Sequence, residues 1–404
     1  MDRHIAFVSL PAHGHVNPTL PVVAELVRRG WRISYVTAER FGPEVEKTGA
    51  TLVPTAGRLP GGPGPGRLSP AAFAGFLERI TADARDSLPG IREHFRVDPP
   101  QAVCYDAMSI TGRVLAATTG AVDVALVPSF ASNERSSAFA RVGTPPPEIL
   151  AAVRDMKVLL TSYGLDAQMR PGMLPPASLN VVFVPPEFQP GADTFDDRYR
   201  FVGPSPSARE DDGGWTPPNE PVLFVSLGTA FNDRPEFFRA CFAAFGGGGP
   251  VAMAVGERVR PEHVRRADAV RRGLFGWSIA DLGAVPANID VRAWFPQPAV
   301  LRHAAAFVSH AGMGSTMEAL YYGVPLVCVP QMVEQEVNAA RVAELGLGVR
   351  LDPEGLTADD LRAAVDAVTG DDAMRAALDR MRDAVHKAGG AVAAADVIEA
   401  HLAA

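Results

Sequence analysis

The sequence has few cysteines and no long apolar run. Its 404 residues include three cysteines, Cys104, Cys241 and Cys328, which are far apart and lie in apolar stretches. No two of them have metal-ligand spacing, and an odd number makes a poor disulfide framework, so we expect buried, reduced thiols. No apolar run is long enough to span a bilayer, and the first residues lack the pattern of a signal peptide. We therefore expect a cytoplasmic protein with no membrane partner.

The sequence also lacks an excess of basic charge. Lys and Arg number 38 against 46 Asp and Glu, which gives a formal net charge of −8. An acidic balance without a basic cluster argues against a nucleic-acid partner. A nucleotide ligand remains compatible with this balance, because it needs only a few local hydrogen-bond donors.

Two motifs of common nucleotide-dependent enzymes are absent. No Asp-x-Asp triplet occurs, and the paired acids lie in predicted loops or helix starts. The first strand-like run is followed by PAHGHVNP rather than by a G-x-G-x-x-G turn, which disfavours a nicotinamide dehydrogenase. We therefore expect no bound metal and no nicotinamide cofactor.

Short β-rich runs alternate with helical patterns in both halves of the chain, which is typical of βαβ units and a parallel sheet covered on both faces. Strands are expected at 4–10, 32–37, 51–54, 101–105, 122–128, 181–185, 221–229 and 251–255, and around 289–291, 306–309 and 325–329. Helices are expected over about 18–29, 40–48 and 234–244, and from about 356 almost to the end. The pattern predicts an α/β fold with two doubly wound domains.

A segment dense in proline, glycine and charge separates the two halves. Residues 205–220 form the best linker candidate in the chain. We expect one domain over 1–204, a second over 221–385, and a C-terminal helix over 386–404 that packs back on the first domain. Two such domains facing each other would bind a ligand in the cleft at the carboxyl ends of both sheets.

Two histidines follow the first predicted strand. His13 and His15 belong to PAHGHVNP, in which Asn17 and Pro18 predict the start of a helix. The positive end of that helix would disfavour the imidazolium form. A neutral histidine there can accept a proton near pH 7. We expect one of the two histidines to do so and the other only to pack or to hydrogen-bond locally.

A general-base histidine needs an acceptor that holds its second ring nitrogen. Asp106 ends a strand of the same predicted sheet and is the natural partner. Alternatively, Asp106 caps a helix that begins near Met108. The two roles are compatible.

A second group of chemistry-bearing residues lies within 292–339. HAGMGS, at 310–315, follows a buried strand and opens a helix, where glycines let backbone amides approach a diphosphate. Glu318, one turn into that helix, is placed to accept hydrogen bonds from ribose hydroxyls. Trp294 offers a flat face for a nucleobase, although tryptophan is by default a core residue. A glycine pair alone predicts little, since many turns contain one.

Taken in order, these motifs carry a family resemblance. The runs W-x-P-Q, H-A-G-x-G-S-x-x-E and P-Q-x-x-E-Q resemble the nucleotide-sugar signature of family 1 glycosyltransferases, which have the GT-B fold. The runs A-H-G-H-V-N-P, S-L-G-T and D-G-G-W are most similar to bacterial macrolide glycosyltransferases. The resemblance covers nearly the whole chain. It implies that the N-terminal domain binds the acceptor and the C-terminal domain binds the nucleotide sugar.

The resemblance also implies roles for individual residues. His15 matches the catalytic base, and Asp106 matches the carboxylate that orients it. Trp294 would stack on the uracil or thymine, while Gln297 and Glu318 would hold the base and the ribose. The diphosphate would be held by Gly228, Thr229, His310, Gly312, Gly314 and Ser315.

The donor sugar is predicted from Glu334 and Gln335. The family has an acidic residue and a glutamine here that grip sugar hydroxyls, and its usual aspartate is replaced by the longer Glu334. A deoxysugar would leave these groups unpaired at a cost of about 1–3 kcal/mol each. UDP-glucose is therefore favoured over a dTDP-deoxysugar.

The acceptor is predicted only as a class. The apolar segments 70–90 and 130–178 are expected to line a roomy pocket for a macrolide, polyketide or flavonoid. The candidate acceptor-binding residues are His13, Phe73, Phe76, Phe130, Phe139 and Met156.

Together these features predict an inverting, metal-independent hexosyltransferase, monomeric or homodimeric, with no cofactor besides its UDP-sugar or dTDP-sugar co-substrate. Two other classes fit the sequence less well. A GT-B epimerase would need extra carboxylates near the anomeric centre. A non-catalytic nucleotide-sugar or macrolide-binding protein would be expected to have lost His15 or Asp106, and both are present.

Overall fold

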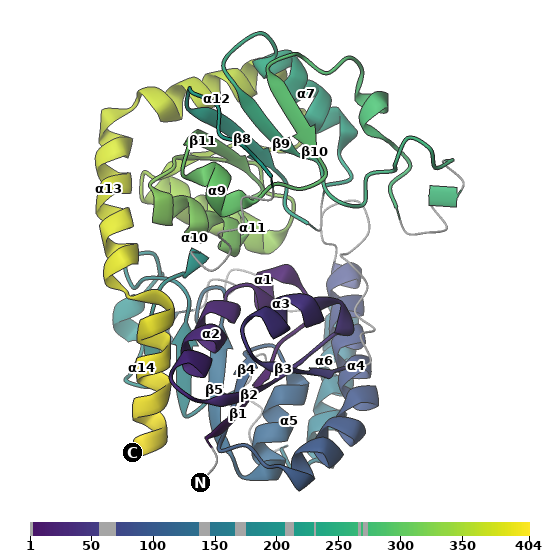
Figure 1. The fold of residues 1–404 in the computed structure, drawn as a ribbon, viewed down its shortest axis with the longest axis vertical. Helices are drawn as coiled ribbons and strands as arrows, with labels where there is room; N and C mark the ends of the chain where they lie inside the picture. Colours follow the sequence, from purple (N-terminus) through teal and green to yellow (C-terminus); the bar gives the residue numbers. More distant parts are fainter. Residues whose placement is uncertain are drawn as a thin grey trace. The chain divides into compact units, whose positions relative to one another are not determined.

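The chain forms two compact units, each built on one parallel sheet with helices (Figure 1). The computed structural model describes residues 3–55, 70–136, 146–165, 175–206, 214–229, 232–265, 268–269 and 274–404. The first unit holds the described residues up to 206 together with Val385–Ala404, and the second holds those from 214 to 384. The predicted α/β architecture with two Rossmann-like domains is confirmed.

The first unit contains a seven-stranded sheet with the order β3-β2-β1-β4-β5-β6-β7. Every neighbouring pair is parallel. The strands are β1 (His4–Val8), β2 (Arg32–Thr37), β3 (Thr51–Pro54), β4 (Ala102–Asp106), β5 (Val122–Val127), β6 (Leu179–Val182) and β7 (Tyr199–Phe201). The strand order reverses between β1 and β4, so the carboxyl ends of these two strands form the switch point where α/β sheets bind ligands.

Helices cover both faces of this sheet, because its strands are apolar on both sides. Ile5 and Phe7 of β1 point to one face, where they pack with helices α2 (Leu20–Arg28) and α14 (Gly390–Ala403). Ala6 and Val8 point to the other face, where they pack with α4 (Pro70–Val97) and α5 (Ile110–Thr119). The C-terminal helix therefore completes the core of the first unit.

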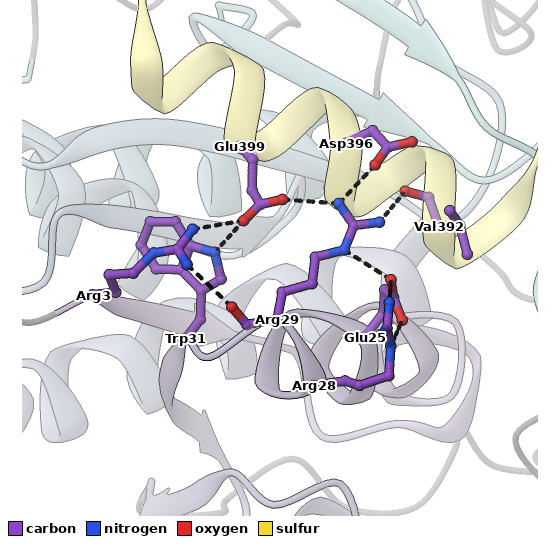
Figure 2. Close-up of polar contacts among 8 residues, drawn as sticks. All are labelled: Arg3, Glu25, Arg28, Arg29, Trp31, Val392, Asp396 and Glu399. Atoms are coloured by element: carbon purple, nitrogen blue, oxygen red, sulfur yellow. Dashed lines mark hydrogen bonds and ion pairs between the residues drawn. The ribbon is translucent and has the colours of Figure 1, made fainter.

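Polar contacts join α14 to α2 (Figure 2). Arg29 donates to Asp396 at 2.6 Å, to Glu399 at 2.8 Å and to Glu25 of its own helix at 2.8 Å. The indole of Trp31 donates to Glu399 at 2.7 Å. The Arg29 side chain is only 18% exposed, so this cluster is partly withdrawn from solvent.

The second unit contains a six-stranded parallel sheet with the order β10-β9-β8-β11-β12-β13. Counted along the chain from β8, this is the 3-2-1-4-5-6 order of dinucleotide-binding domains, with its switch point between β8 and β11. The strands are β8 (Val222–Ser226), β9 (Val251–Ala254), β10 (Ile289–Arg292), β11 (Ala304–Ser309), β12 (Leu326–Cys328) and β13 (Gly348–Arg350).

The remaining helical segments connect these strands or extend from them. In the first unit they are α1 (His13–Val16), η1 (Glu39–Phe41), α3 (Gly42–Lys47), α6 (Pro147–Ser162) and η3 (Ala192–Thr194). In the second unit they are α7 (Pro235–Phe245), η5 (Ile279–Leu282), α9 (Gln297–Leu301), α10 (Met313–Tyr322), α11 (Val333–Glu344) and α12 (Ala358–Gly370). Helix α13 (Asp372–Lys387) contains the point at which the chain returns to the first unit.

Two strands were not predicted, β7 and β13. Each has three residues and lies at an edge of its sheet, and so short a run shows no recognisable alternation. All three cysteines are free and buried, as expected. None of the helices in the described ranges combines the length and apolar character needed to cross a bilayer.

Candidate active site

One candidate site lies at the switch point of the first sheet. Strands β1 and β4 are paired neighbours, so the chain segments that leave their carboxyl ends emerge side by side. Helix α1, which carries His13 and His15, follows β1, and Asp106 is the last residue of β4. The fold thereby brings together residues 91 positions apart in the sequence.

His15 and Asp106 form a short hydrogen bond. His15 Nδ1 lies 2.6 Å from Asp106 Oδ2. A neutral His15 placed in this way donates its Nδ1–H to the carboxylate, which leaves Nε2 as a proton acceptor. The His15 side chain is 23% exposed and that of Asp106 is 2% exposed. The imidazole can therefore meet a ligand, while the carboxylate behind it is shielded from water.

Asp106 uses its other oxygen to brace the following turn. Its Oδ1 accepts the backbone N–H of Met108 at 2.9 Å. The prediction that Asp106 caps the next helix is wrong, because α5 begins at Ile110 and its cap is Ser109, which accepts from Gly112 N at 3.1 Å. The carboxylate is thus fixed by a turn amide, and its second oxygen is held at His15.

The predicted helix start at Asn17 and Pro18 is also wrong. Asn17 ends the four-residue helix α1, and α2 begins at Leu20 after Thr19. The Thr19 hydroxyl lies 2.8 Å from the Val16 carbonyl and 2.6 Å from the Tyr35 hydroxyl. These tertiary contacts override the local Asn-Pro signal. His15 is part of a short helix rather than of a loop preceding one, so the helix-dipole argument for its charge state loses its basis.

The predicted acceptor-binding residues fall into four groups. His13 is exposed and meets the Phe41 ring edge-on at 5.1 Å between centroids. Phe73 and Phe76 are partly buried against the cluster formed by α4, α5 and α6.

The other three predicted acceptor residues contribute less to an open surface. Phe130 stacks on Phe188 at 5.5 Å, and Met156 lies in the cluster of α4, α5 and α6; both are buried. Phe139 lies outside the described residues. The composition of an acceptor pocket therefore stays a prediction.

A second candidate site lies at the switch point of the second sheet. Two turns leave the carboxyl ends of the paired strands β8 and β11. The first contains Gly228 and the exposed Thr229, and the second runs from His310 to Gly312, the N-cap of α10. A glycine-rich turn that opens a ten-residue helix can bind a phosphate through its backbone amides.

The His310 ring is enclosed by two glycine backbones. A Cβ atom built on Gly228 or on Gly312 would lie less than 3.0 Å from ring atoms of His310, whereas one on Gly314 would meet nothing within 4 Å. Gly228 and Gly312 are therefore required by the packing of His310. The space beside Gly314 leaves its backbone accessible to a ligand.

Burial keeps His310 neutral. Desolvation lowers the pKa of its imidazole to about 4, and the backbone of Ser226 offsets part of this effect. Near pH 7 the ring can therefore donate one hydrogen bond but carries no charge.

Polar side chains along α9 and α10 are linked to one another. Gln297 Nε2 donates to Glu318 Oε2 at 2.6 Å and contacts Ser315 Oγ at 3.3 Å. Trp294 lies just before this group with 52% of its surface exposed, which is unusual for a tryptophan. The structure therefore brings together Gln297, Ser315 and Glu318, and it leaves the Trp294 ring accessible.

The two predicted sugar-gripping residues begin helix α11 (Figure 1). Glu334 is half-buried. Gln335 is 4% exposed, and its Oε1 accepts the backbone N–H of Gln331 at 2.7 Å. Gln335 thus uses its carbonyl to hold the preceding loop, which leaves the amide nitrogen as the end that can face a hydroxyl.

Sequence reasoning missed two buried asparagines beside the glycine turns, Asn232 and Asn338. Each donates to a turn carbonyl, at 2.8 Å and 2.9 Å respectively. The Asn338 pairing has no local sequence signal, because Asn338 is 27 positions away from the turn it holds. In the parts of the chain that the structure describes, no three His, Cys, Asp or Glu side chains cluster as a metal site would require.

The chain resembles known proteins along its whole length. Residues 276–395 match the family model described as erythromycin biosynthesis protein CIII-like, C-terminal domain. The NDP-glycosyltransferase YjiC of Bacillus licheniformis is 38% identical over 422 residues, which cover 99% of this chain and 98% of that protein. The oleandomycin glycosyltransferase of Streptomyces antibioticus is 35% identical over 414 residues, with 99% and 91% covered.

The fold is shared with solved enzymes of the same kind. The crystal structure of CalG4, the calicheamicin glycosyltransferase, superposes with a TM-score of 0.82 at 36% identity and covers 100% of this chain and 98% of that chain. Identity at this level over nearly every residue, on the same two-sheet fold, extends well beyond a shared motif. This chain belongs to the family 1 glycosyltransferases that act on natural products.

Proposed function

We propose that this glycosyltransferase moves a hexose, from UDP-glucose in the first instance, onto a hydroxyl of a hydrophobic natural product such as a macrolide or polyketide. The observation that carries the proposal is the hydrogen bond of 2.6 Å between His15 Nδ1 and the buried Asp106 carboxylate. A histidine oriented in this way can act as a general base, with Nε2 as the nitrogen that takes a hydroxyl proton.

The reaction is a single displacement. His15 Nε2 takes the proton of the acceptor hydroxyl, and the oxygen forms a bond to the anomeric carbon of the donor. The bond from that carbon to the diphosphate oxygen breaks, and the nucleoside diphosphate leaves with the electron pair. Asp106 stabilises the imidazolium that results. One displacement inverts the configuration at the anomeric carbon.

The second unit supplies groups that suit the leaving diphosphate. The amides at the start of α10 carry the positive end of the helix dipole, equivalent to about half an elementary charge. His310 lies between the two turns as an uncharged ring, since burial lowers its pKa to about 4. These groups support a reaction that needs no metal ion.

The donor is proposed from the start of α11. Glu334 and the amide nitrogen of Gln335 provide an acceptor and a donor for sugar hydroxyls. A hexose that has those hydroxyls forms hydrogen bonds with both groups, whereas a deoxysugar lacks the hydroxyls to form them. This favours UDP-glucose over dTDP-deoxysugars.

The test is a panel of donors and acceptors with EDTA present throughout. UDP-glucose, dTDP-glucose and a dTDP-deoxysugar are each combined with macrolide, polyketide and phenolic acceptors, and the products are analysed by mass and by anomeric configuration. We expect acceptor-dependent UDP release and a β-linked hexose from the α-linked donor. Turnover confined to dTDP-deoxysugars would overturn the donor assignment, and loss of turnover in EDTA would overturn metal independence. Nucleotide binding without any transfer would indicate a non-catalytic binding protein.

A further inference from the structure

The two turns that enclose His310 are built in the same way. Each follows a strand that ends in serine, and Ser226 and Ser309 are register partners in β8 and β11. The backbone N–H of Gly228 donates to Ser226 Oγ, and that of Ala311 donates to Ser309 Oγ, both at 3.2 Å. Both turn residues have left-handed backbones, with φ of 74° at Gly228 and 60° at Ala311.

Ala311 is the exceptional member of this pair. Among the residues that the structure describes, it is the only one other than glycine with a positive φ. The left-handed region is unfavourable for a side chain with a Cβ, so surrounding contacts must hold such a residue there. Ala311 is fully buried, and the next two residues lead into α10.

A buried asparagine holds each of these turns. Asn338 Nδ2 donates to the Ala311 carbonyl at 2.9 Å, and Asn232 Nδ2 donates to the Gly228 carbonyl at 2.8 Å. Asn338 is 0% exposed and Asn232 is 1% exposed. Within the described ranges, neither Oδ1 atom has a hydrogen-bond partner. Burying an amide oxygen without a hydrogen-bond partner costs free energy of folding. An apolar side chain would fill the same space without that cost, so the asparagines serve more than packing.

The enclosed histidine makes the position of both turns critical. Because the His310 ring lies against the backbones of Gly228 and Gly312, a shift of either turn displaces the ring or collides with it. The same shift would change the direction in which the backbone N–H groups at the start of α10 point.

We propose that Asn232 and Asn338 are positioning residues that lock the two turns around His310 and thereby preform the site for the donor diphosphate. This inference rests on the proposed function, since it assigns the diphosphate to these turns. Neither asparagine needs to contact the ligand. Each fixes a backbone carbonyl and through it the orientation of the neighbouring amides.

The test compares UDP with uridine as ligands of the purified chain. Asn338→Ala should weaken UDP binding by about tenfold, the effect of losing one buried hydrogen bond. The affinity for uridine should be unchanged, because in the proposed site the nucleoside lies at Trp294 and not at these turns. Adding Ala311→Gly to the same variant should restore part of the UDP affinity, since glycine adopts the left-handed backbone without support. Asn232→Ala tests the other turn in the same way, and it replaces Asn338→Ala as the test if that variant does not fold.

Asn288 provides a matched control. It lies in the same unit, and its Nδ2 donates to the Phe245 and Gly249 carbonyls at 2.9 and 2.8 Å, just before the amino end of β10. Asn288→Ala should lower the Tm without changing UDP affinity. Equal UDP affinity in wild type and in both Asn232→Ala and Asn338→Ala would overturn the positioning role alone. A wild-type chain that binds neither UDP nor dTDP would overturn the proposed function, and the positioning role with it.

Discussion

Burial of His310 makes the free energy of unfolding of the second unit depend on pH. Its imidazole has a pKa of about 4 when folded, against 6.5 for an ordinary histidine, because burial disfavours its charged form. The unfolded chain therefore binds a proton at this residue as pH falls through 6.5, while the folded chain does so only near 4. By linkage, the free energy of unfolding decreases as pH drops through that window.

Replacing His310 should remove part of this pH dependence. Between pH 7 and 4 the wild-type protein should lose about 3 kcal/mol of stability through this residue, and a His310→Asn variant should lose correspondingly less. Urea unfolding of both proteins at several pH values measures the difference. Identical pH slopes in the two proteins would mean that the imidazole is not withdrawn from water.

Gly112 sets the distance between α5 and the strand that carries Asp106. A Cβ atom at this position would collide with the Tyr105 side chain, and rigid packing cannot absorb such an overlap. Gly112→Ala should destabilise the protein by about 1–3 kcal/mol and reduce transfer by displacing Asp106. Gly90→Ala is the control: its Cβ meets nothing within 4 Å in helix α4, so it should be neutral or stabilising by about 0.5–1 kcal/mol. Thermal unfolding compares the two, and equal effects would contradict the packing argument.

At the scale of elements, two adjacent arginines at the end of α2 contribute unequally to the attachment of α14. Arg29, the residue that follows α2, contacts α14, and we expect Arg28 to contribute less. Arg29 is 18% exposed and forms ion pairs with Asp396 and Glu399 of α14, whereas Arg28 is 72% exposed and pairs with Glu25 of its own helix (Figure 2). Exposed pairs within one helix contribute little, while removing one partner of a partly buried cluster leaves charges uncompensated.

Arg29→Met should therefore destabilise the first unit by about 1–3 kcal/mol, and Arg28→Met by less than about 0.5 kcal/mol. Hydrogen exchange should show faster opening of α14 in the first variant only. The pairs of Glu25 also depend on pH: hydrogen bonds from Arg28 and then Arg29 lower the pKa of Glu25 to about 2, so the contribution of this carboxylate is complete above about 4.5 and is lost as pH falls towards 2. Equal effects of the two substitutions would exclude the bridging role of Arg29.

Which elements could be predicted from the sequence follows from how local their signals are. Strands such as β2 and β3 match their predicted bounds, because an apolar run of β-formers between turn residues is sufficient evidence. The start of α2 was misplaced because the local Asn-Pro signal does not report the hydrogen bond between the hydroxyls of Thr19 and the distant Tyr35. The hydrogen bond from Asn338 to the Ala311 carbonyl could not be predicted for the same reason, because it depends on the packing of α11 beside the loop before α10.

At the scale of the whole molecule, the candidate site residues occupy equivalent positions in the two sheets. In each unit the strand order reverses beside the first strand, and the loops that leave the carboxyl ends there carry the chemistry: His15 with Asp106 in the first, and Gly228 with His310 in the second. The sequence could predict which residues lie at those ends. It could not predict that the Asp106 carboxylate would be buried, or that two glycines would enclose His310, since both depend on side-chain packing.

The central claim is that His15, oriented by Asp106, is the base for sugar transfer. The most direct measurement is acceptor-dependent UDP release by wild type, His15→Ala, Asp106→Asn and His13→Ala, with UDP affinity measured in each variant. We predict that His15→Ala lowers kcat by about 10²–10⁴-fold, that Asp106→Asn also lowers kcat, that His13→Ala retains turnover, and that all four bind UDP equally. Undiminished turnover by His15→Ala, or its loss in His13→Ala instead, would contradict the claim.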